Sequence, residues 1–260
     1  MSDVLVVKLG GTTFEEQRDV LTEIASIARQ RPVVLVHGGG KRLTEWLARL
    51  GVGTTFDGGL RVTDPAALEV ATAVLRGVVN SELVSALRDL GVDAVGLSGV
   101  DGGLLITERV PGIGLVAHVV GIRRDLLDAL LVVGQLPVIA PLARDETGIV
   151  CNVNADDAAA GIAAGLGSRQ FVLLTDVDGV RDGNGDRLST LSAPEAEELI
   201  ERGVIGAGMV PKVRAALASL AWPGAEAIIA DGSGALALHR ALGDPGYGTR
   251  IHAERVEVVA

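Results

Sequence analysis

The chain has 260 residues, of which 48% are hydrophobic and only 2% aromatic, and its formal net charge at pH 7 is −10. This charge repels nucleic acid and anionic membranes, and so few aromatic rings exclude a stacking platform for bases. The single cysteine, Cys151, excludes an internal disulfide and a multi-cysteine metal site. The first apolar run, Val4–Val7, is too short for a signal peptide, and no run reaches the ~18 apolar residues of a membrane span. We therefore expect a cytoplasmic protein that binds neither nucleic acid nor membrane.

The first 50 residues predict two strand–helix units in which each strand ends in a glycine-rich turn. Val4–Leu9 is an apolar, β-branched run followed by two glycines, and Val33–Val36 is a second such run followed by a turn with three glycines. Helices are expected over 14–30 and 41–50, where apolar residues recur at helical spacing. This alternation predicts a parallel, doubly wound α/β sheet, which binds ligands where its strands end.

The remainder of the chain continues this alternation, with one hairpin inserted. Asp64 and Pro65 are an N-cap and a proline at the first helical position, so they open a long helix. The segment 165–168 is a candidate domain boundary. The predicted elements are helix 65–90, strand 92–97, a hairpin of 104–107 with 115–120, helix 123–133, strand 136–140, extended segment 149–152, helix 154–166, strand 171–174, helices 194–202 and 213–222, strand 227–230, helix 235–242 and strand 256–259.

Three motifs look like ligand sites but do not meet the requirements. Gly40-Lys41 is not a P-loop, because Leu35 replaces the first glycine and an arginine replaces the Ser/Thr. The segment 112–117 matches a dinucleotide fingerprint by letter, yet it leads into a predicted strand and therefore favours a hairpin turn. The aspartates of 181–187 lack the helix–loop–helix spacing of a calcium site, so this segment is predicted to be a tight turn.

Lysine is rare in this chain, and its positions form a pattern. Of the 23 basic residues only Lys8, Lys41 and Lys212 are lysine, and the other 20 are arginine. All three lie near glycines in loop-like sequence, where a compact ammonium on a flexible stem can meet a phosphoryl group. The alternative is that an arginine-rich composition has left three lysines by chance, and this alternative applies most to Lys41. Lys8 and Lys212 are therefore the candidates for a phosphoryl site.

Asp156 and Asp157 form an acidic pair at the start of the apolar helix 154–166. A buried aspartate between two lysines would hold both ammonium groups in place and keep them charged. The alternative role for Asp156 is that of an N-terminal helix cap. No Ser-His-Asp or Cys-His arrangement is defensible in this sequence. Phosphoryl transfer, in contrast, needs mainly positioning and charge neutralisation, which glycine turns and lysines supply.

Eight segments resemble the amino acid kinase family and, within it, the kinases that act on N-acetylglutamate. They follow the family's order and cover almost the whole chain, so the set is specific although each segment alone is weak. The segments are VVKLGG (6–11), LVHGGGK (35–41), GLRVTD (59–64), AVGLSG (94–99), NVNAD (152–156), LLTDVDGV (173–180), GAGMVPKV (206–213) and GTRI (248–251).

The resemblance implies a three-layer αβα sandwich with a mainly parallel central sheet, the amino acid kinase or carbamate kinase-like fold. It implies an N-terminal lobe over 1–167 for acyl amino acid binding and dimerisation, and a C-terminal lobe over 168–260 for ATP. The implied reaction transfers the γ-phosphoryl group of ATP to the side-chain carboxylate of N-acetyl-L-glutamate, giving N-acetyl-L-glutamyl 5-phosphate for arginine biosynthesis. Mg²⁺ would be held by the nucleotide phosphates, and no protein metal ligands are expected.

The resemblance also assigns roles to residues at the matching motifs. Lys8 and Lys212 would stabilise the transferring phosphoryl group, and Asp156 would organise both lysines. Gly11 and Gly39 would donate backbone N–H groups to phosphoryl oxygens. The substrate-binding set is Gly39, Gly40, Arg61 and Asn152, with Arg61 suited to bidentate pairing with the α-carboxylate. The nucleotide-binding set is Lys8, Gly10, Gly11, Thr175, Asp176, Val177, Asp178, Gly179, Val180, Arg181, Val204, Ile205, Gly206, Met209 and Lys212.

The sequence departs from the family pattern in three respects. Thr12 and Thr13 replace the usual small residues after the first glycine pair, and Val100 stands where many relatives carry lysine. These positions are candidates for tuning the substrate. Arginine-inhibited relatives resemble one another in an extra N-terminal helix that builds a hexamer, whereas this chain begins at its first strand. The expectation is a homodimer that is insensitive to arginine.

Three other interpretations stay open on the sequence. A kinase of aminoadipate or glutamate held by an acidic carrier protein would need a basic rim, and a chain at −10 is a poor host for an acidic partner. Glutamate 5-kinase or carbamate kinase would share the lysines but not the motifs around Arg61 and Asn152 together. A nucleotide-binding sensor without catalysis would be marked by loss of either lysine or of Asp156, and all three are present.

Overall fold

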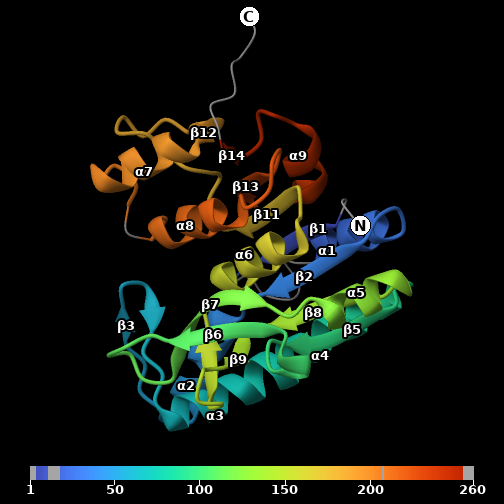
Figure 1. The fold of residues 1–260 in the computed structure, drawn as a ribbon, viewed down its shortest axis with the longest axis vertical. Helices are drawn as coiled ribbons and strands as arrows, with labels where there is room; N and C mark the ends of the chain where they lie inside the picture. Colours follow the sequence, from blue (N-terminus) through green and yellow to red (C-terminus); the bar gives the residue numbers. More distant parts are fainter. Residues whose placement is uncertain (1–3, 11–17, 207, 254–260) are drawn as a thin grey trace, which may run out of the picture.

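The computed structural model describes residues 4–10, 18–206 and 208–253, and an eight-stranded sheet forms its centre (Figure 1). The strands are β1 (Leu5–Leu9), β2 (Val33–His37), β5 (Ala94–Ser98), β8 (Leu136–Ala140), β11 (Gln170–Thr175), β12 (Thr190–Ser192), β13 (Glu226–Asp231) and β14 (Thr249–His252). Their order is β12-β14-β13-β11-β1-β2-β8-β5, and every neighbouring pair is parallel except β13–β14. The predicted mainly parallel sheet is therefore confirmed.

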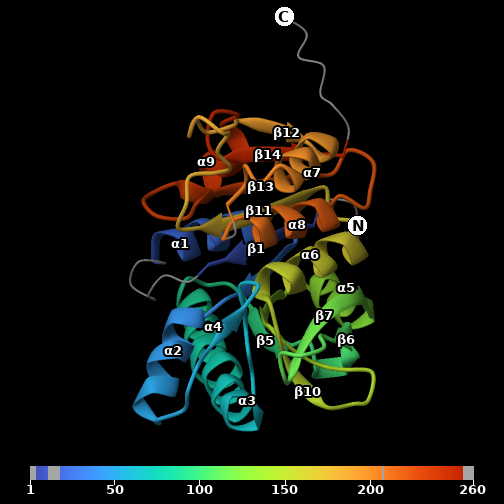
Figure 2. The same cartoon turned by 90° about the vertical axis from the view of Figure 1, so that its left-hand side faces the viewer.

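Helices cover both faces of this sheet, which makes the fold a three-layer αβα sandwich (Figures 1 and 2). One face carries α1 (Arg18–Ala28), α4 (Asn80–Asp89) and α9 (Ala237–Gly243), and the other carries α5 (Asp125–Val132), α6 (Ala155–Leu166), α7 (Ala193–Glu201) and α8 (Val210–Ser219). Side chains alternate between the two faces along each strand. In β1, Leu5, Val7 and Leu9 accordingly join the apolar cluster with α1, and Val6 joins the cluster with α6.

A smaller closed barrel packs against α6. Its strands are β6 (Leu105–Arg109), β7 (Val116–Ile122), β9 (Leu142–Arg144) and β10 (Val150–Val153), and the short 3₁₀ helix η2 (Asp101–Gly103) precedes them. β6 and β7 form the predicted antiparallel hairpin. The segment between them, which matches a dinucleotide fingerprint by letter, contains the turn with Gly112 and Gly114 at positive φ. That segment is therefore a hairpin turn, as the sequence indicates.

The remaining elements surround the glycine turn after β2. They are α2 (Gly40–Arg49), β3 (Phe56–Asp57), β4 (Leu60–Arg61), α3 (Pro65–Ala71) and the π-helix η1 (Thr72–Val79), which continues into α4. The side chain of Asp64 caps α3 by accepting a hydrogen bond from the backbone N–H of Ala67 at 2.7 Å. Within the described part of the chain, the continuous helix from Pro65 to Asp89 is the one long and apolar enough to cross a membrane by length and composition alone. One third of its apolar window is buried, and the buried residues pack into the core.

Two strands of the central sheet were missed in the sequence. β12 and β14 are short and mix polar with apolar residues, so they carry no clear alternating pattern. The predicted strand 256–259 lies outside the described residues. Residues 14–17 of the predicted helix 14–30 also lie outside them, and the helix ends at Ala28, two residues earlier than predicted. The sheet therefore gains its C-terminal edge from segments that only tertiary pairing identifies.

Two helical glycines provide a matched test of the packing between α6 and β7. A Cβ at Gly165 would lie 2.3 Å from Cγ1 of Ile122, whereas a Cβ at Gly77 would meet nothing within 4 Å. Gly165→Ala should therefore lower the free energy of unfolding by about 1–3 kcal/mol. Gly77→Ala should leave it unchanged or raise it by up to about 1 kcal/mol. Urea unfolding measures both variants, and equal effects would contradict the close approach of α6 to β7.

Candidate active site

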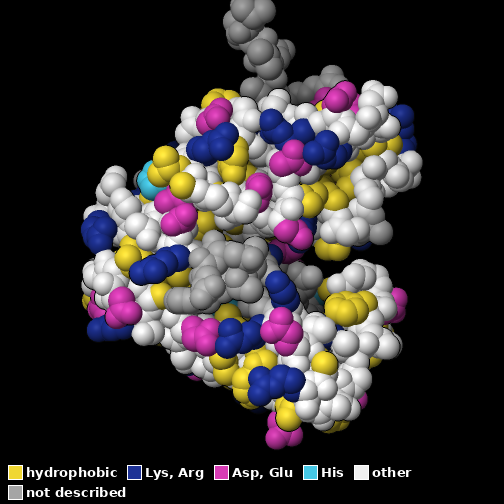
Figure 3. Space-filling view, turned by 180° about the vertical axis from the view of Figure 1, so that it is seen from behind, with side chains coloured by type: hydrophobic (Ala, Val, Ile, Leu, Met, Phe, Trp, Pro, Cys, Tyr) yellow, Lys and Arg dark blue, Asp and Glu magenta, His cyan; other side chains and the backbone are white. Residues whose placement is uncertain are grey.

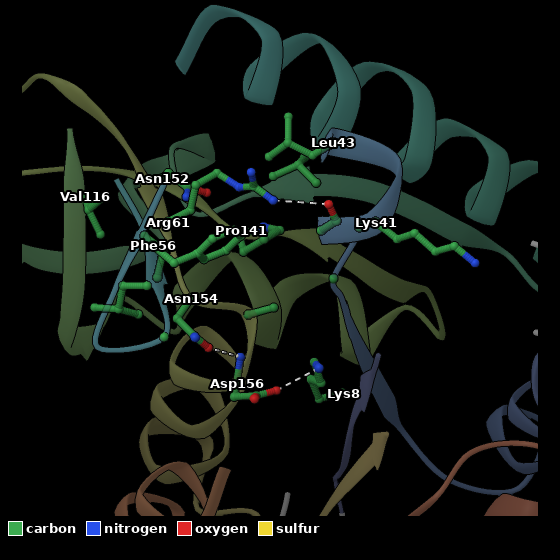
Figure 4. A pocket seen from close by; sticks show the side chains of 18 of the residues that line it. Lys8, Lys41, Leu43, Phe56, Arg61, Val116, Pro141, Asn152, Asn154 and Asp156 are labelled. Atoms are coloured by element: carbon green, nitrogen blue, oxygen red, sulfur yellow. Dashed lines mark hydrogen bonds and ion pairs between the residues drawn. The ribbon is translucent and has the colours of Figure 1, made fainter. Parts of the chain in front are cut away.

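Lys8, Asp156 and Lys212 meet where three elements converge. Lys8 follows Val6 by two residues on β1, so its side chain points to the same face as Val6, toward α6. Asp156 lies in the first turn of α6, and Lys212 lies in the first turn of α8. The Lys8 Nζ is 2.8 Å from Asp156 Oδ1 (Figure 4), and the Lys212 Nζ donates to Asp156 Oδ2 at 3.2 Å. One carboxylate thus holds two ammonium groups from distant parts of the chain.

The cluster is buried, and its charges depend on one another. The side chains of Lys8 and Asp156 are only 8% and 7% exposed. Burial by itself would raise the pKa of Asp156, but the charges of Lys8 and Lys212 outweigh burial and lower that pKa. The carboxylate therefore stays ionised.

The cap of α6 is a different residue from the one that the sequence offered. The side-chain oxygen of Asn154 accepts hydrogen bonds from the backbone N–H groups of Asp156 and Asp157, at 2.7 and 3.3 Å. The alternative role of Asp156 as the helix cap is therefore wrong. Because Asn154 satisfies the helix terminus, the carboxylate of Asp156 is left for the two lysines.

A cavity of about 280 Å³ opens beside the cluster. All three lysines of the chain line it, although the side chain of Lys41 is exposed and points away from Lys8 and Asp156 (Figure 4). The four residues expected to bind the acyl substrate, Gly39, Gly40, Arg61 and Asn152, also line it. Its charged lining consists of the cations Lys8, Lys41, Arg61 and Lys212 and the anion Asp156. A cavity with this excess of positive charge favours an anionic ligand, although the whole chain carries −10.

The cavity lies where the molecule is notched. Figure 3 shows a hollow at this edge of the molecule from behind, and in Figure 1 β3 and α8 are the elements on its two sides. The turn of the β3–β4 hairpin approaches α8, because a Cβ at Gly59 would lie 3.6 Å from Cγ of Pro211. The hairpin that carries Arg61 and the helix that carries Lys212 are therefore neighbours across the notch.

Two glycines let the backbone come close to the site. Gly39 has a φ of 141°, and a Cβ there would lie 2.7 Å from Cδ2 of Leu75. A Cβ at Gly10 would lie 2.7 Å from the carbonyl oxygen of Leu174 and 3.4 Å from the Lys8 Nζ. Any larger residue at either position would displace its neighbours. Gly11, the other expected backbone donor, lies outside the described residues.

The side chain of Arg61 is held by groups of the protein itself. It is buried and lies over the ring of Phe56 at 4.7 Å. Its Nη1 donates to the Thr54 hydroxyl, and its Nη2 donates to the carbonyl oxygen of Gly40 at 3.2 Å and to the Thr44 hydroxyl at 2.8 Å. Burial lowers the pKa of Arg61, but a guanidinium remains charged at neutral pH. The side-chain amide of Asn152 is also oriented by the protein, because its Nδ2 donates to the Thr63 hydroxyl at 3.4 Å.

A second cavity, of about 520 Å³, lies where β11 and β13 end. Asp231 lines it and was not expected from the sequence, whereas every other lining residue was. Asp231 is paired in register with Thr175, so the parallel ends of β11 and β13 bring it to the site. The expected members are 176–181, 204–206 and Met209.

Among the described residues of the expected nucleotide set, four do not line this second cavity. Lys8 and Lys212 line the first cavity instead, and Gly10 and Thr175 line neither. The hydroxyl of Thr175 donates to Asp176 Oδ1 at 3.0 Å, and this hydrogen bond is the main cause of the lowered pKa of Asp176. The charges of Lys212 and Lys8 lower the same pKa further, so the lysine cluster and the second cavity are electrostatically linked.

A buried histidine supports the glycine turn after β2. His37 Nδ1 lies 2.6 Å from the carbonyl oxygen of Gly38, and Nε2 lies 3.1 Å from Nδ2 of Asn80. Burial lowers the pKa of His37 to about 4, so the ring is neutral at physiological pH. Its one proton is then on Nδ1, and Nε2 accepts from Asn80. The Oδ1 of Asn80 accepts from Arg76 at 3.1 Å, which extends the network to η1. Sequence reasoning missed these contacts.

Comparisons with known proteins show the family to which the chain belongs. A family model described as the amino acid kinase family matches residues 3–231. The acetylglutamate kinase of Rubrobacter xylanophilus is 44% identical over 253 residues, which are 96% of this chain and 97% of that relative. The chain therefore belongs to the amino acid kinase family, as its motifs predict.

Solved structures show the same fold. The N-acetylglutamate synthase of Neisseria gonorrhoeae, in complex with coenzyme A and N-acetyl-glutamate, is 26% identical with a TM-score of 0.83, over 98% of this chain and 60% of that one. The carbamate kinase of Giardia lamblia bound to AMP-PNP is 21% identical with a TM-score of 0.69, over 98% of this chain and 100% of that one. The second likeness bears on the fold alone, and it confirms the carbamate kinase-like architecture.

The buried His37 predicts a loss of stability in acid. A histidine in the unfolded chain titrates near 6.5, whereas folded His37 titrates near 4, so between these values only the unfolded chain binds the proton. The contribution of His37 to the free energy of unfolding is constant above pH 6.5, and it lowers that free energy by roughly 3 kcal/mol as the pH falls to 4. Urea unfolding at a series of pH values measures the slope. The part of this slope that comes from His37 should be absent in His37→Gln and present in the surface control His118→Gln. An unchanged slope in His37→Gln would contradict the assignment.

Proposed function

We propose that the chain transfers the γ-phosphoryl group of ATP to the side-chain carboxylate of N-acetyl-L-glutamate, forming N-acetyl-L-glutamyl 5-phosphate in arginine biosynthesis. The main support is the cluster in which one buried carboxylate holds two lysine ammoniums beside a small cationic cavity. Relatives named acetylglutamate kinase, 44% and 40% identical over nearly the full chain, support the choice of substrate.

In this proposal the two cavities hold the two substrates. The acyl amino acid occupies the 280 Å³ cavity, with its α-carboxylate on Arg61 and with Asn152 and the glycine turn around it. ATP occupies the 520 Å³ cavity, and its γ-phosphoryl group extends to Lys8 and Lys212. Strong positive charge at the meeting point offsets the repulsion between two anionic substrates.

The chemistry requires charge stabilisation and no base. A carboxylate oxygen of the substrate attacks the γ-phosphorus, a new O–P bond forms, the bond from the γ-phosphorus to the bridging oxygen breaks, and ADP leaves. Because the attacking oxygen is already anionic, no proton has to be removed. Lys8 and Lys212 neutralise the transferring group, and Gly11 and Gly39 donate backbone N–H groups to it. Asp156 acts as a positioning residue for the two lysines.

Magnesium enters this scheme with ATP as part of the substrate. Across residues 4–10, 18–206 and 208–253, no group of three or more His, Cys, Asp or Glu side chains is arranged to hold a metal ion. Asp178, which lines the larger cavity, is already paired with Arg181 at 2.9 Å. We therefore assign Mg²⁺ to the nucleotide phosphates.

The same proposal covers the organisation of the chain. Residues 1–167 form the lobe that binds the acyl amino acid and dimerises, and residues 168–260 form the ATP lobe. The protein acts in the cytoplasm as a homodimer. Light scattering gives the mass directly, and a hexamer would contradict this assignment.

A hydroxamate assay for acyl phosphate, with ATP and Mg²⁺, tests the reaction. N-acetyl-L-glutamate should be turned over in preference to free glutamate and N-acetyl-L-aminoadipate. Lys8→Ala should lower kcat on the order of 100-fold or more, because it removes one of two charges that stabilise the transition state. Arg88→Ala is the control, since Arg88 pairs with Asp93 and lines neither cavity, and it should stay within about twofold of the unaltered chain.

One result would contradict the proposed substrate, and another would contradict the proposed role of the lysines. If no free amino acid reacts although ATP binds, the kinase of a carrier-bound substrate or a non-catalytic sensor replaces this proposal. If Lys8→Ala retains full turnover, the substrate assignment survives but the role of the lysine cluster does not.

A further inference from the structure

The contacts of Arg61 restrict how it can bind a ligand. A guanidinium has five N–H donors, and it pairs with a carboxylate through one of two parallel forks. One fork uses Nε–H with a hydrogen of Nη2, and the other uses a hydrogen of Nη1 with a hydrogen of Nη2. Nη2, which both forks use, donates to the Gly40 carbonyl at 3.2 Å and to the Thr44 hydroxyl at 2.8 Å. These two acceptors lie only 2.8 Å apart, so together they hold one side of the guanidinium and fix the direction in which its remaining donors point.

The Thr44 hydroxyl is itself fixed in direction. Its single hydrogen is donated to the carbonyl oxygen of Gly40 at 2.8 Å, one helical turn back on α2. Its lone pairs therefore face Arg61 and accept from Nη2. Gly40, Thr44 and Arg61 form a closed set of three hydrogen bonds at the first turn of α2. Figure 4 shows the Arg61 side chain extending to this turn, with a dashed line for the hydrogen bond.

Further contacts fix the rest of the side chain. The Thr54 hydroxyl accepts from Nη1, and the Phe56 ring lies under the guanidinium at 4.7 Å. The Thr63 hydroxyl donates to the backbone carbonyl of Arg61 at 2.9 Å, which anchors β4. These contacts set the orientation of the guanidinium before a ligand carboxylate binds to it.

We propose that Thr44 is a positioning residue that sets the orientation of Arg61 and thereby the selectivity of the acyl cavity for an α-carboxylate. This inference rests on the proposed function for the identity of the ligand. Without the Thr44 hydroxyl, a hydrogen of Nη2 loses its acceptor, and the guanidinium is free to rotate away from the direction that meets the α-carboxylate. Binding of the α-carboxylate then weakens, whereas binding of a neutral α-carboxamide, which depends less on the charge of Arg61, changes little.

Calorimetry tests this with two ligands, N-acetyl-L-glutamate and its α-carboxamide, N-acetyl-L-isoglutamine. Thr44→Val should weaken binding of the α-carboxylate about tenfold, change binding of the α-carboxamide by less than about threefold, and so reduce the preference between them. Thr44→Ser keeps the hydroxyl and should restore the preference. Thr22→Val is the matched control. The Thr22 hydroxyl also donates a hydrogen bond one helical turn back, to the carbonyl oxygen of Arg18 at 3.0 Å, but Thr22 does not line the cavity. Thermal unfolding of each variant shows that it is folded.

The outcomes separate this inference from the proposed function. If the unaltered chain binds N-acetyl-L-glutamate and Thr44→Val keeps both the affinity and the preference, the positioning role is overturned and the proposed function stands. Equal weakening of both ligands would also overturn it, because a merely structural role of Thr44 gives that result. If the unaltered chain does not bind N-acetyl-L-glutamate, the proposed function fails and the inference fails with it.

Discussion

The ion pairs between one buried aspartate and two lysines are the interaction on which the site depends. Asp156 carries one negative charge, and Lys8 and Lys212 carry one positive charge each. The cluster of three side chains therefore has one positive charge in excess. A buried carboxylate without such partners would take up a proton, and two buried ammoniums without the carboxylate would repel each other. The two lysines therefore keep the carboxylate of Asp156 ionised, and the cluster offers its excess positive charge to a further anion.

The fold is arranged so that these three side chains can meet. The alternation of β1 places Lys8 on the face that α6 covers, and parallel pairing brings the end of β1 beside the end of β11. Small residues along α6 allow it to lie close to β7, since at Gly161 and Gly165 even a methyl group would overlap a side chain of that strand. Asn154 satisfies the helix terminus and leaves the neighbouring carboxylate for charge pairing.

Much of this architecture was predictable from the sequence, and the reasons are local. Apolar runs that end in glycines marked β1 and β2, and the rare lysines marked the site. Other features depend on pairing that the sequence does not encode locally. β12 and β14 are short and mixed in polarity, and Asp231 reaches the larger cavity only through its register with Thr175. The hydroxyl of Thr44 and the buried ring of His37 leave no periodic signal, because their partners are set by tertiary contacts. The bidentate pairing expected of Arg61 rests on its residue type and stays a prediction, whereas the contacts that hold its guanidinium are set by the fold.

Single-turnover formation of acyl phosphate by Asp156→Asn, together with the dissociation constants of ATP and N-acetyl-L-glutamate, shows whether Asp156 positions the two lysines for transfer. The substitution keeps the size of the side chain and removes the charge that holds Lys8 and Lys212. The account predicts that the rate of transfer falls on the order of 100-fold or more while both dissociation constants stay within about threefold. A rate equal to that of the unaltered protein would contradict it, because the two lysines would then be placed without the aspartate.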